Sequence, residues 1–259
     1  MKVTILGCGP SYGLPTAVRG FGDCNPNNPK NYRTRAGLFL SDKDTSVLID
    51  TPPELRLQLV RENIKHIDAV LWTHLHSDHT AGIDDIKIFA STSFSHIDRT
   101  IDAFVYQKDA DDFSNQYAYL LKSQILKKED KPVLALSTFD ERKSFKVKNL
   151  DFIPILQNHG KSHSIGFRVG DFAYNTDLVD LTETEFEKLK GIKTWVLGVC
   201  SYRGNTKHLT VEKALEYIEK LKPEKAYFTH MGATLDYDKL KSELPDGVEP
   251  AFDGLSFDV

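Results

Sequence analysis

The feature that most constrains this chain is residues 71–82, a short apolar run that leads into a cluster of metal-binding side chains. The stretch reads Leu-Trp-Thr-His-Leu-His-Ser-Asp-His-Thr-Ala-Gly. Its apolar start predicts a buried strand, and the polar residues after it predict a loop and the start of a helix. His74 and His76 are two residues apart, so on an extended backbone they point to the same side and can bind one cation. Asp78 and His79 follow the turn, where they can face a second cation beside the first.

Three more metal-binding side chains follow apolar strands elsewhere in the sequence. His159, Asp177 and His230 come after the apolar runs 153–156, 172–175 and 225–229. A single residue of this kind is usually a turn residue or a cap. Three of them, in a chain that also carries residues 71–82, indicate a site assembled at a sheet edge, where α/β folds build their sites. Two neighbouring ions suit the hydrolysis of a phosphoester or an acyl bond.

Composition and charge are those of an ordinary globular protein. The chain has 259 residues, 40% of them hydrophobic and 27% charged, with a net charge of −4. This balance argues against a protein that coats nucleic acid. The N-terminal apolar run is too short for a signal peptide, and no window approaches the roughly 20 apolar residues of a membrane span. We therefore expect a cytoplasmic protein without a membrane partner. Its three cysteines lack a C-x-x-C pair and are expected to be reduced thiols.

Strand and helix patterns are interspersed along the whole chain. The patterns predict strands at 2–6, 36–40, 46–49, 69–73, 101–106, 133–136, 144–147, 150–156, 165–169, 172–175, 194–199 and 225–229. They predict helices at 53–63, 83–90, 109–128, 182–189 and 211–220. Residues 13–35 are rich in Gly, Pro and Asn and predict a long irregular loop, which is often functional. No Pro/Gly/Ser linker divides the chain, so we expect one mixed α/β domain over 1–259.

The order of these motifs resembles the metallo-β-lactamase superfamily. The motifs are H-x-H-x-D-H at 74–79, Asn-His-Gly at 158–160, Asn-Thr-Asp at 175–177 and Phe-Thr-His at 228–230, and residues 6–9, 48–51 and 207–209 also match. The resemblance covers nearly the whole chain. It is greatest to the phosphodiesterase branch, which includes tRNase Z and the phosphodiesterase of the carbon–phosphorus lyase pathway. It implies an αββα four-layer sandwich with the site at one edge of the two sheets.

The resemblance also implies a role for each motif residue. One metal would be held by His74, His76 and His159, the other by Asp78, His79 and His230, and Asp177 would bridge them. Asp78 and His208 are the expected catalytic residues, with His208 as the general acid that protonates the leaving oxygen. Alternatively, His208 is only a residue at a helix start. Nitrogen and oxygen ligands suit several divalent ions, and we expect two, manganese or zinc.

The sequence departs from this branch in the loop at 13–35. The carbon–phosphorus lyase pathway phosphodiesterase has an additional structural zinc, bound by three cysteines of this loop and by a histidine three residues after the last catalytic ligand. Here only Cys24 lies in the loop, and Ala233 stands at the histidine position. We therefore predict no structural zinc, and expect packing and Asn-Pro turns to hold the loop. Arg33 and Arg35 at its end are candidates for binding a substrate phosphate, although most arginines are solvated or paired with a carboxylate.

These observations predict a dinuclear-metal phosphodiesterase that acts on a small or cyclic phosphodiester, such as a cyclic nucleotide or a ribose cyclic phosphate. A water held between two dications becomes a nucleophile near neutral pH. One alternative is tRNA 3′-end processing, but the chain lacks a basic flexible arm, which argues against a nucleic-acid substrate. Another is a metal-binding or nucleotide-binding module without catalysis. We expect a mononucleotide-like ligand, and the resemblance is compatible with a homodimer.

Overall fold

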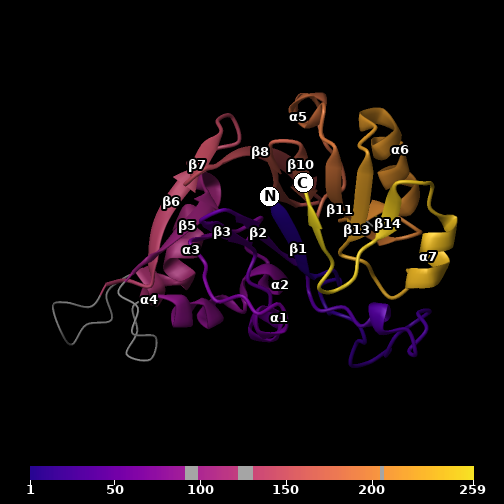
Figure 1. Ribbon diagram of the computed structural model, residues 1–259, viewed down its shortest axis with the longest axis horizontal. Coiled ribbons are helices and arrows are strands. Elements are labelled where there is room, and N and C mark those ends of the chain that lie inside the picture. The colour runs from indigo at the N-terminus through magenta and orange to yellow at the C-terminus, as the bar shows by residue number, and fades with distance from the viewer. Residues whose placement is uncertain (91–98, 122–130, 205–206) are drawn as a thin grey trace.

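Two β-sheets pack face to face, with helices on both outer sides (Figure 1). This computed structural model describes residues 1–259 except 91–98, 122–130 and 205–206. The architecture is the αββα sandwich that the sequence predicts, so the expected fold class is confirmed.

The two sheets divide the chain between them. In spatial order, the first contains β15 (Ser256–Asp258), β1 (Lys2–Gly7), β2 (Gly37–Asp42), β3 (Thr45–Ile49), β4 (Ala69–Leu71), β5 (Ile101–Tyr106) and β6 (Leu134–Phe139). The second contains β14 (Val248–Pro250), β13 (Lys225–Thr229), β11 (Thr194–Ser201), β10 (Phe172–Asn175), β9 (Ser162–Val169), β8 (Leu150–His159) and β7 (Phe145–Val147), and β12 (Leu209–Thr210) pairs with β11. The helices are α1 (Leu55–Arg61), α2 (Ser77–Thr80), α3 (Ala110–Gln116), α4 (Ala118–Leu121), α5 (Glu183–Leu189), α6 (Val211–Leu221) and α7 (Tyr237–Glu243). Short 3₁₀ helices are η1 (Pro29–Asn31), η2 (Ile83–Phe89) and η3 (Gln107–Asp109).

Strand β3 illustrates how the sequence builds the layers. Val47 and Ile49 belong to the hydrophobic cluster shared with the second sheet, whereas Leu48 belongs to the cluster that contains Leu55 and Leu59 of α1. Successive side chains of a strand point to opposite faces, so a strand buried on both faces must be apolar at every position. The continuous apolar run of β3 therefore places this strand between the second sheet and a helix.

The expected helices differ from the structure in two places. The segment expected to be helical at 83–90 is the 3₁₀ helix η2. The helix expected at 109–128 is broken, because α3 ends at Gln116 and α4 begins at Ala118, and residues 122–128 lie outside the described part. Asp, Ser and Asn, which are weak helix formers, fill much of α3 and favour an early end. Phe113, Tyr117 and Leu120 are buried on both sides of the break, so the spacing of apolar residues does not reveal it.

Both ends of the chain lie in the first sheet. Strand β15 pairs antiparallel with β1, and the N-terminal ammonium donates to the carbonyl of Val259 at 2.8 Å. This pairing is compatible with one domain over 1–259, which stays a prediction. None of the helices in the described ranges is long and apolar enough to cross a membrane.

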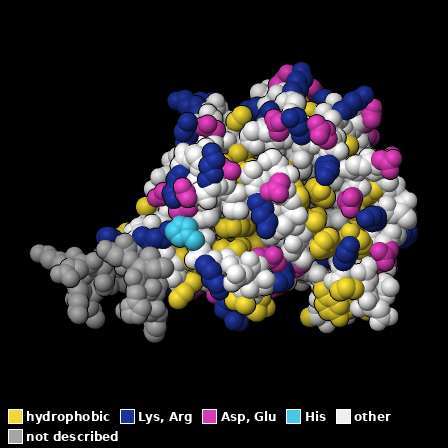
Figure 2. Space-filling view, in the orientation of Figure 1, with side chains coloured by type: hydrophobic (Ala, Val, Ile, Leu, Met, Phe, Trp, Pro, Cys, Tyr) yellow, Lys and Arg dark blue, Asp and Glu magenta, His cyan; other side chains and the backbone are white. Residues whose placement is uncertain are grey.

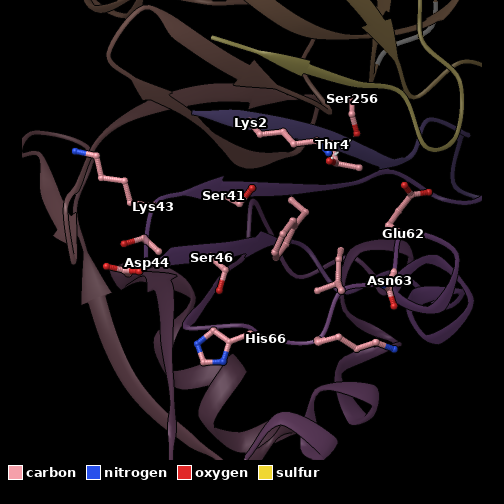
Figure 3. Close-up of a pocket in the computed structure, with 14 residues that line it drawn as sticks. Lys2, Thr4, Ser41, Lys43, Asp44, Ser46, Glu62, Asn63, His66 and Ser256 are labelled. Atoms are coloured by element: carbon pink, nitrogen blue, oxygen red, sulfur yellow. Dashed lines mark hydrogen bonds between the residues drawn. The ribbon is translucent and has the colours of Figure 1, made fainter.

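A hollow of about 590 Å³ lies on the outer face of the first sheet, at its edge beside the two termini (Figure 3). Its floor carries Thr4 of β1, Ser41 of β2 and Ser46 of β3. In β2 the outward side chains change from Phe39, which packs in the helix-covered cluster, to the hydroxyl of Ser41. Helix α1 ends at Arg61. The sheet face beyond the helix is polar because it meets water.

Asp68 links several elements at the start of β4. Its carboxylate accepts hydrogen bonds from Ser46 at 2.9 Å, His66 at 2.8 Å and Lys148 at 2.5 Å, and its side chain is 7% exposed. Burial favours the neutral acid, but the hydrogen bonds from Lys148, His66 and Ser46 outweigh it and lower the pKa of Asp68 from 3.8 to about 2. Because the pKa is lower in the folded state, the stabilisation is complete above pH 4 and is lost as the pH falls through 2.

Asp68→Asn is therefore expected to lower the free energy of unfolding at pH 7 by about 1–3 kcal/mol, the cost of losing hydrogen bonds to a buried charge. The difference from the unmodified protein should shrink between pH 4 and pH 2. Urea denaturation at pH 7 and pH 2.5 measures both. Asp151→Asn removes an exposed ion pair with Lys146 and should change stability by less than about 1 kcal/mol. Equal effects of the two substitutions would contradict the prediction.

Candidate metal centre

The candidate ligands meet at one edge of the sandwich because their strands end there. Strands β10, β11 and β13 run parallel, and Asp177 and His230 follow the ends of β10 and β13. His159 is the last residue of β8, which is longer than the strand expected at 150–156. The loop between β4 and α2 carries His74 and His76, and α2 carries Asp78 and His79. The expectation that these strand ends meet is therefore correct.

His74, His76 and His159 form one group of converging imidazoles. Nε2 of His74 lies 2.8 Å from Nδ1 of His76, and Nε2 of His159 lies 3.3 Å from the same atom. Ring nitrogens this close must share a proton or a cation between them. Three neutral imidazole nitrogens facing one point fit a divalent transition metal.

Asp78, His79, Asp177 and His230 form a second group. Nε2 of His79 lies 3.2 Å from Asp177 and 3.4 Å from Asp78, and Nε2 of His230 lies 3.3 Å and 3.8 Å from the same two carboxylates. Among the described residues, Nε2 of His79 and both ring nitrogens of His230 are buried without a hydrogen-bond partner. Buried polar atoms normally have partners. These nitrogens therefore fit as ligands of a second ion.

Asp177 lies between the two groups. One of its oxygens is 3.8 Å from Nε2 of His159, in the first group, and 3.3 Å from Nε2 of His230, in the second. The side chain is 2% exposed. A buried carboxylate in this position can bind two cations at once, as the resemblance implies.

The structure adds Asp50, at the end of β3, as a residue that orients two of the histidines. Its carboxylate accepts a hydrogen bond from Nδ1 of His79 at 2.7 Å and one from the hydroxyl of Thr73 at 2.9 Å. The oxygen of Thr73 lies 3.0 Å from Nδ1 of His74. With both Nδ1 atoms engaged, Nε2 of His79 and of His74 are left to face the ions. The sequence signal for Asp50 was its place at a strand end, in the matching stretch 48–51, but no role was assigned to it.

Burial and neighbouring charges shift the pKa values of the site residues in opposite directions. Burial favours the neutral acid at Asp177, but His230 and His79 outweigh it and hold the pKa of Asp177 well below its ordinary value. Burial opposes the charged form of His230, yet Asp177 raises the pKa of His230 to about 10. Burial and the neighbouring His79 lower the pKa of His74 well below its ordinary value. Metal binding at this site must therefore displace protons.

Three residues of the site have left-handed backbone conformations. The φ angles are 66° at Asp50, 54° at Asp177 and 56° at His230. Residues other than glycine rarely adopt this conformation, and they keep it only where the surrounding structure holds them. The backbone strain lies at the candidate ligands and at the residue that orients them.

His208 lies beside both groups. Its Nδ1 is 3.6 Å from Asp177, and its ring stacks on that of His230 with centroids 4.6 Å apart. Burial and the neighbouring His230 lower the pKa of His208 to about 3. The ring is therefore neutral at pH 7 in this arrangement. His163, by contrast, is bonded to Asp109 at 2.9 Å and belongs to neither group.

The structure contradicts the expectation that Arg33 binds substrate. Arg33 is 1% exposed, and its guanidinium donates to the side chain of Asn31 and to the backbone carbonyls of Met231, Gly232 and Leu235. A buried guanidinium with these bonds cannot reach a ligand in solvent. Arg35 is partly exposed and forms an ion pair with Glu54, and it also donates to the carbonyl of Ser11 at 3.1 Å. Its role in substrate binding stays a prediction.

The long loop between β1 and β2 is held mainly by the residues that follow His230. Asp23 N donates to the carbonyl of Ala233 at 2.9 Å, and the thiol of Cys24 donates to the same carbonyl at 3.5 Å. The backbone of Asn25 and the side chain of Asn31 both donate to Asp236. The sequence predicts that packing and Asn-Pro turns hold the loop. It overlooked these cross-links because their partner segment lies about 200 positions away.

Comparison with known proteins places this site in a family context. A family model described as the beta-lactamase superfamily domain matches residues 45–231, a range that includes every candidate ligand. A crystal structure described as a new diphosphatase from the PhnP family is 28% identical, with a TM-score of 0.90 over 100% of this chain and 97% of that chain. The short form of human tRNase Z is 16% identical, with a TM-score of 0.70 over 100% of this chain and 99% of that chain, which shows a shared fold alone.

An octanoyltransferase from Porphyromonas gingivalis (strain ATCC BAA-308 / W83) is also similar in sequence. It is 28% identical over an alignment of 259 positions, which covers 98% of this chain and 51% of that protein. The chain therefore spans about half the length of this curated relative.

Proposed function

Because the chain belongs to the metallo-β-lactamase superfamily, we propose that it is a dinuclear metal-dependent phosphodiesterase that hydrolyses a small or cyclic phosphodiester, such as a cyclic nucleotide or a ribose cyclic phosphate. One observation carries the proposal. A single buried carboxylate, Asp177, lies within 3.8 Å of histidines from two groups of potential ligands. Two adjacent cations suit phosphoryl transfer because they stabilise charge on both the entering and the leaving oxygen.

Each group would hold one divalent ion. One ion would be held by His74, His76 and His159, the other by Asp78, His79 and His230, and Asp177 would contact both. When bound, the ions would lower the pKa of a water molecule and neutralise charge on the phosphoryl oxygens. Imidazole nitrogens favour zinc over magnesium or calcium, which prefer oxygen alone, and manganese, the other expected ion, fits the carboxylates of Asp78 and Asp177.

His208 is the proposed general acid. Its ring is neutral at pH 7 before substrate enters, because burial and His230 keep the pKa near 3. An anionic phosphodiester beside the ring would raise that pKa, since a nearby negative charge favours the imidazolium. The ring would then carry a proton at the place where the leaving oxygen needs one. Asp78, the other catalytic residue expected, would act by orienting the second ion.

The relatives support this choice of reaction without deciding the substrate. The similar diphosphatase suggests that a diphosphate ester should be tested beside phosphodiesters. The octanoyltransferase is matched over only half of its length, so its activity is not carried over, but a thioester belongs among the controls. tRNA 3′-end processing remains the alternative enzyme activity, and a metal-binding or nucleotide-binding module without catalysis is the alternative from another class.

The remaining proposals concern partners and compartment. The loop between β1 and β2 exposes Tyr12, Val18 and Tyr32, at 79%, 93% and 53% exposure. Figure 2 shows hydrophobic side chains gathered at the lower right, where Figure 1 places this loop. Exposed apolar patches mark interaction surfaces, which supports the proposed homodimer. Three free cysteines support a reducing compartment such as the cytoplasm.

The deciding experiment measures turnover of a substrate panel by protein reconstituted with Mn²⁺ or Zn²⁺. The panel contains bis-p-nitrophenyl phosphate, 2′,3′-cyclic nucleotides, a diphosphate ester, a precursor tRNA, a thioester and a β-lactam. We expect turnover of the small phosphoesters, its loss in His76→Ala and its retention in His66→Ala, since His66 lies outside both groups. Hydrolysis of the thioester or the β-lactam alone would contradict the proposal. No turnover with two metals bound would favour the non-catalytic module.

A further inference from the structure

Arg33 is a buried cation whose hydrogen bonds go to neutral groups. Its side chain is 1% exposed, and no Asp or Glu among the described residues forms an ion pair with it. Taking a charge out of water costs several kcal/mol unless its donors are bonded. Here one terminal nitrogen donates to the carbonyl of Leu235 at 2.6 Å and to Oδ1 of Asn31 at 3.0 Å, and the other donates to Gly232 at 3.3 Å and Met231 at 3.4 Å. Nε of Arg33 has no hydrogen-bond partner among the described residues, so the two terminal nitrogens make all the bonds of this guanidinium that the structure describes. Three of the four acceptors are thus backbone carbonyls of one short segment.

That segment, residues 231–235, directly follows His230. The backbone of His230 is left-handed, with a φ of 56°, so it needs its surroundings to hold it. The next two amide groups are also held, because Met231 N donates to the carbonyl of Cys8 at 2.8 Å and Gly232 N to that of Cys200 at 3.0 Å. A side chain at Gly232 would have its Cβ 2.7 Å from the oxygen of Cys200. The turn after His230 is therefore bonded through its amides on one side and through its carbonyls on the other.

We infer that Arg33 is a positioning residue that holds the turn after His230, so that Nε2 of His230 faces the carboxylates of Asp78 and Asp177. This inference rests on the proposed function, because it treats His230 as a ligand of the second ion. A planar guanidinium suits the task because its fork can donate to several carbonyls at fixed angles. A lysine carries the same charge but lacks the fork. The backbone carbonyls of the turn accept hydrogen bonds from the guanidinium but carry no net charge. The shape of the turn therefore depends on these hydrogen bonds.

Asn31 completes the link and aligns the guanidinium. Its Oδ1 accepts from Arg33 at 3.0 Å and from the backbone of Tyr237 at 2.9 Å, and its Nδ2 donates to Asp236 at 2.7 Å. Asn31 itself is 0% exposed. The loop between β1 and β2 and the segment after His230 thus behave as one bonded unit. Arg33 is the most deeply buried charged residue of this unit.

The test is a metal-binding titration on the full chain. Elemental analysis after dialysis against chelator-buffered Zn²⁺ should resolve two binding steps, which His159→Ala and His230→Ala assign to the first and the second ion. Arg33→Met should weaken the second step by about 10- to 100-fold, the size of effect expected for a residue that orients a ligand, and leave the first unchanged. Arg33→Lys should restore part of that affinity.

Arg168→Met is the matched control. Arg168 also donates to three backbone carbonyls, those of Gly170, Lys188 and Lys190. These carbonyls lie in the turn between β9 and β10 and at the C-terminal end of α5, away from His230. We expect this variant to lose stability and to keep both metal affinities. The comparison therefore separates the positioning of His230 from the general benefit of an arginine bonded to carbonyls.

The outcomes are distinguishable. If His230→Ala keeps both binding steps, the proposed ligand role of His230 fails. If His230→Ala loses the second step while Arg33→Met keeps both, the inference about Arg33 is overturned and the proposed function stands. Equal weakening of both steps in Arg33→Met also overturns it, since that result marks a general structural role. Should Arg33→Met not fold, Arg33→Lys decides by the same comparison of the two steps.

Discussion

Replacing Asp177 by asparagine is expected to reduce bound metal and turnover together, more than any other single change in the site. The carboxylate lies 3.2 Å from His79, 3.3 Å from His230 and 3.8 Å from His159, so it serves both groups of ligands. The substitution keeps the shape and removes the charge. Metal affinity should fall more than about 100-fold, beyond the effect of losing a residue that only orients a ligand. Turnover should fall by at least about 10³-fold, because the charge stabilisation at phosphorus is lost with the ions.

Elemental analysis and steady-state kinetics on the same preparation measure this prediction. Asp171→Asn is the matched control, because Asp171 follows β9 on an exposed turn and pairs with Lys193. It should keep both metals and full turnover. If Asp177→Asn kept two metals and full turnover, Asp177 would not bridge the ions. Thermal unfolding of metal-free protein checks that the variant is folded.

The candidate site was predictable from sequence because strand ends carry positional information. A metal-binding residue after each of several apolar strands indicates one sheet edge, and parallel strands such as β10 and β13 end at the same edge. His74, Asp177 and His230 therefore lie together although they are far apart in the chain. The αββα class followed from the resemblance. Apolar runs such as that of β3 agree with it, because a strand between a sheet and a helix must be apolar on both faces.

The residues that hold the ligands were not predictable in the same way. Asp50 orients His79 through a hydrogen bond across 29 positions, and no period or spacing signals such a pair. Arg33 lies in a loop without periodicity, where the sequence cannot distinguish a buried arginine from one that meets substrate. Its acceptors are backbone carbonyls, which have no signature in the side-chain sequence. Contacts of this kind, between a side chain and distant backbone atoms, become visible only in the folded structure.

His208→Ala is expected to lower turnover by about 10²- to 10⁴-fold while both metals stay bound. The ring lies 3.6 Å from Asp177 and forms a third group with His159 and Asp177, but it belongs to neither of the two groups proposed to hold the ions. Burial and the neighbouring His230 lower the pKa of His208 to about 3, so an anionic substrate would have to raise that pKa before the ring could donate a proton at pH 7. Its proposed contribution is therefore made during the reaction, and metal content should not change.

The dependence on the leaving group separates acid catalysis from a packing effect. An alkoxide needs a proton as it leaves, whereas p-nitrophenolate is stable without one, so the loss in His208→Ala should be large for a cyclic nucleotide and small for bis-p-nitrophenyl phosphate. His163→Ala is the matched control, since His163 is bonded to Asp109 outside both groups, and it should leave both rates unchanged. Unchanged kinetics on the cyclic nucleotide would remove His208 as the acid. Equal losses on both substrates would instead assign the ring, which stacks on His230, to substrate or ligand positioning.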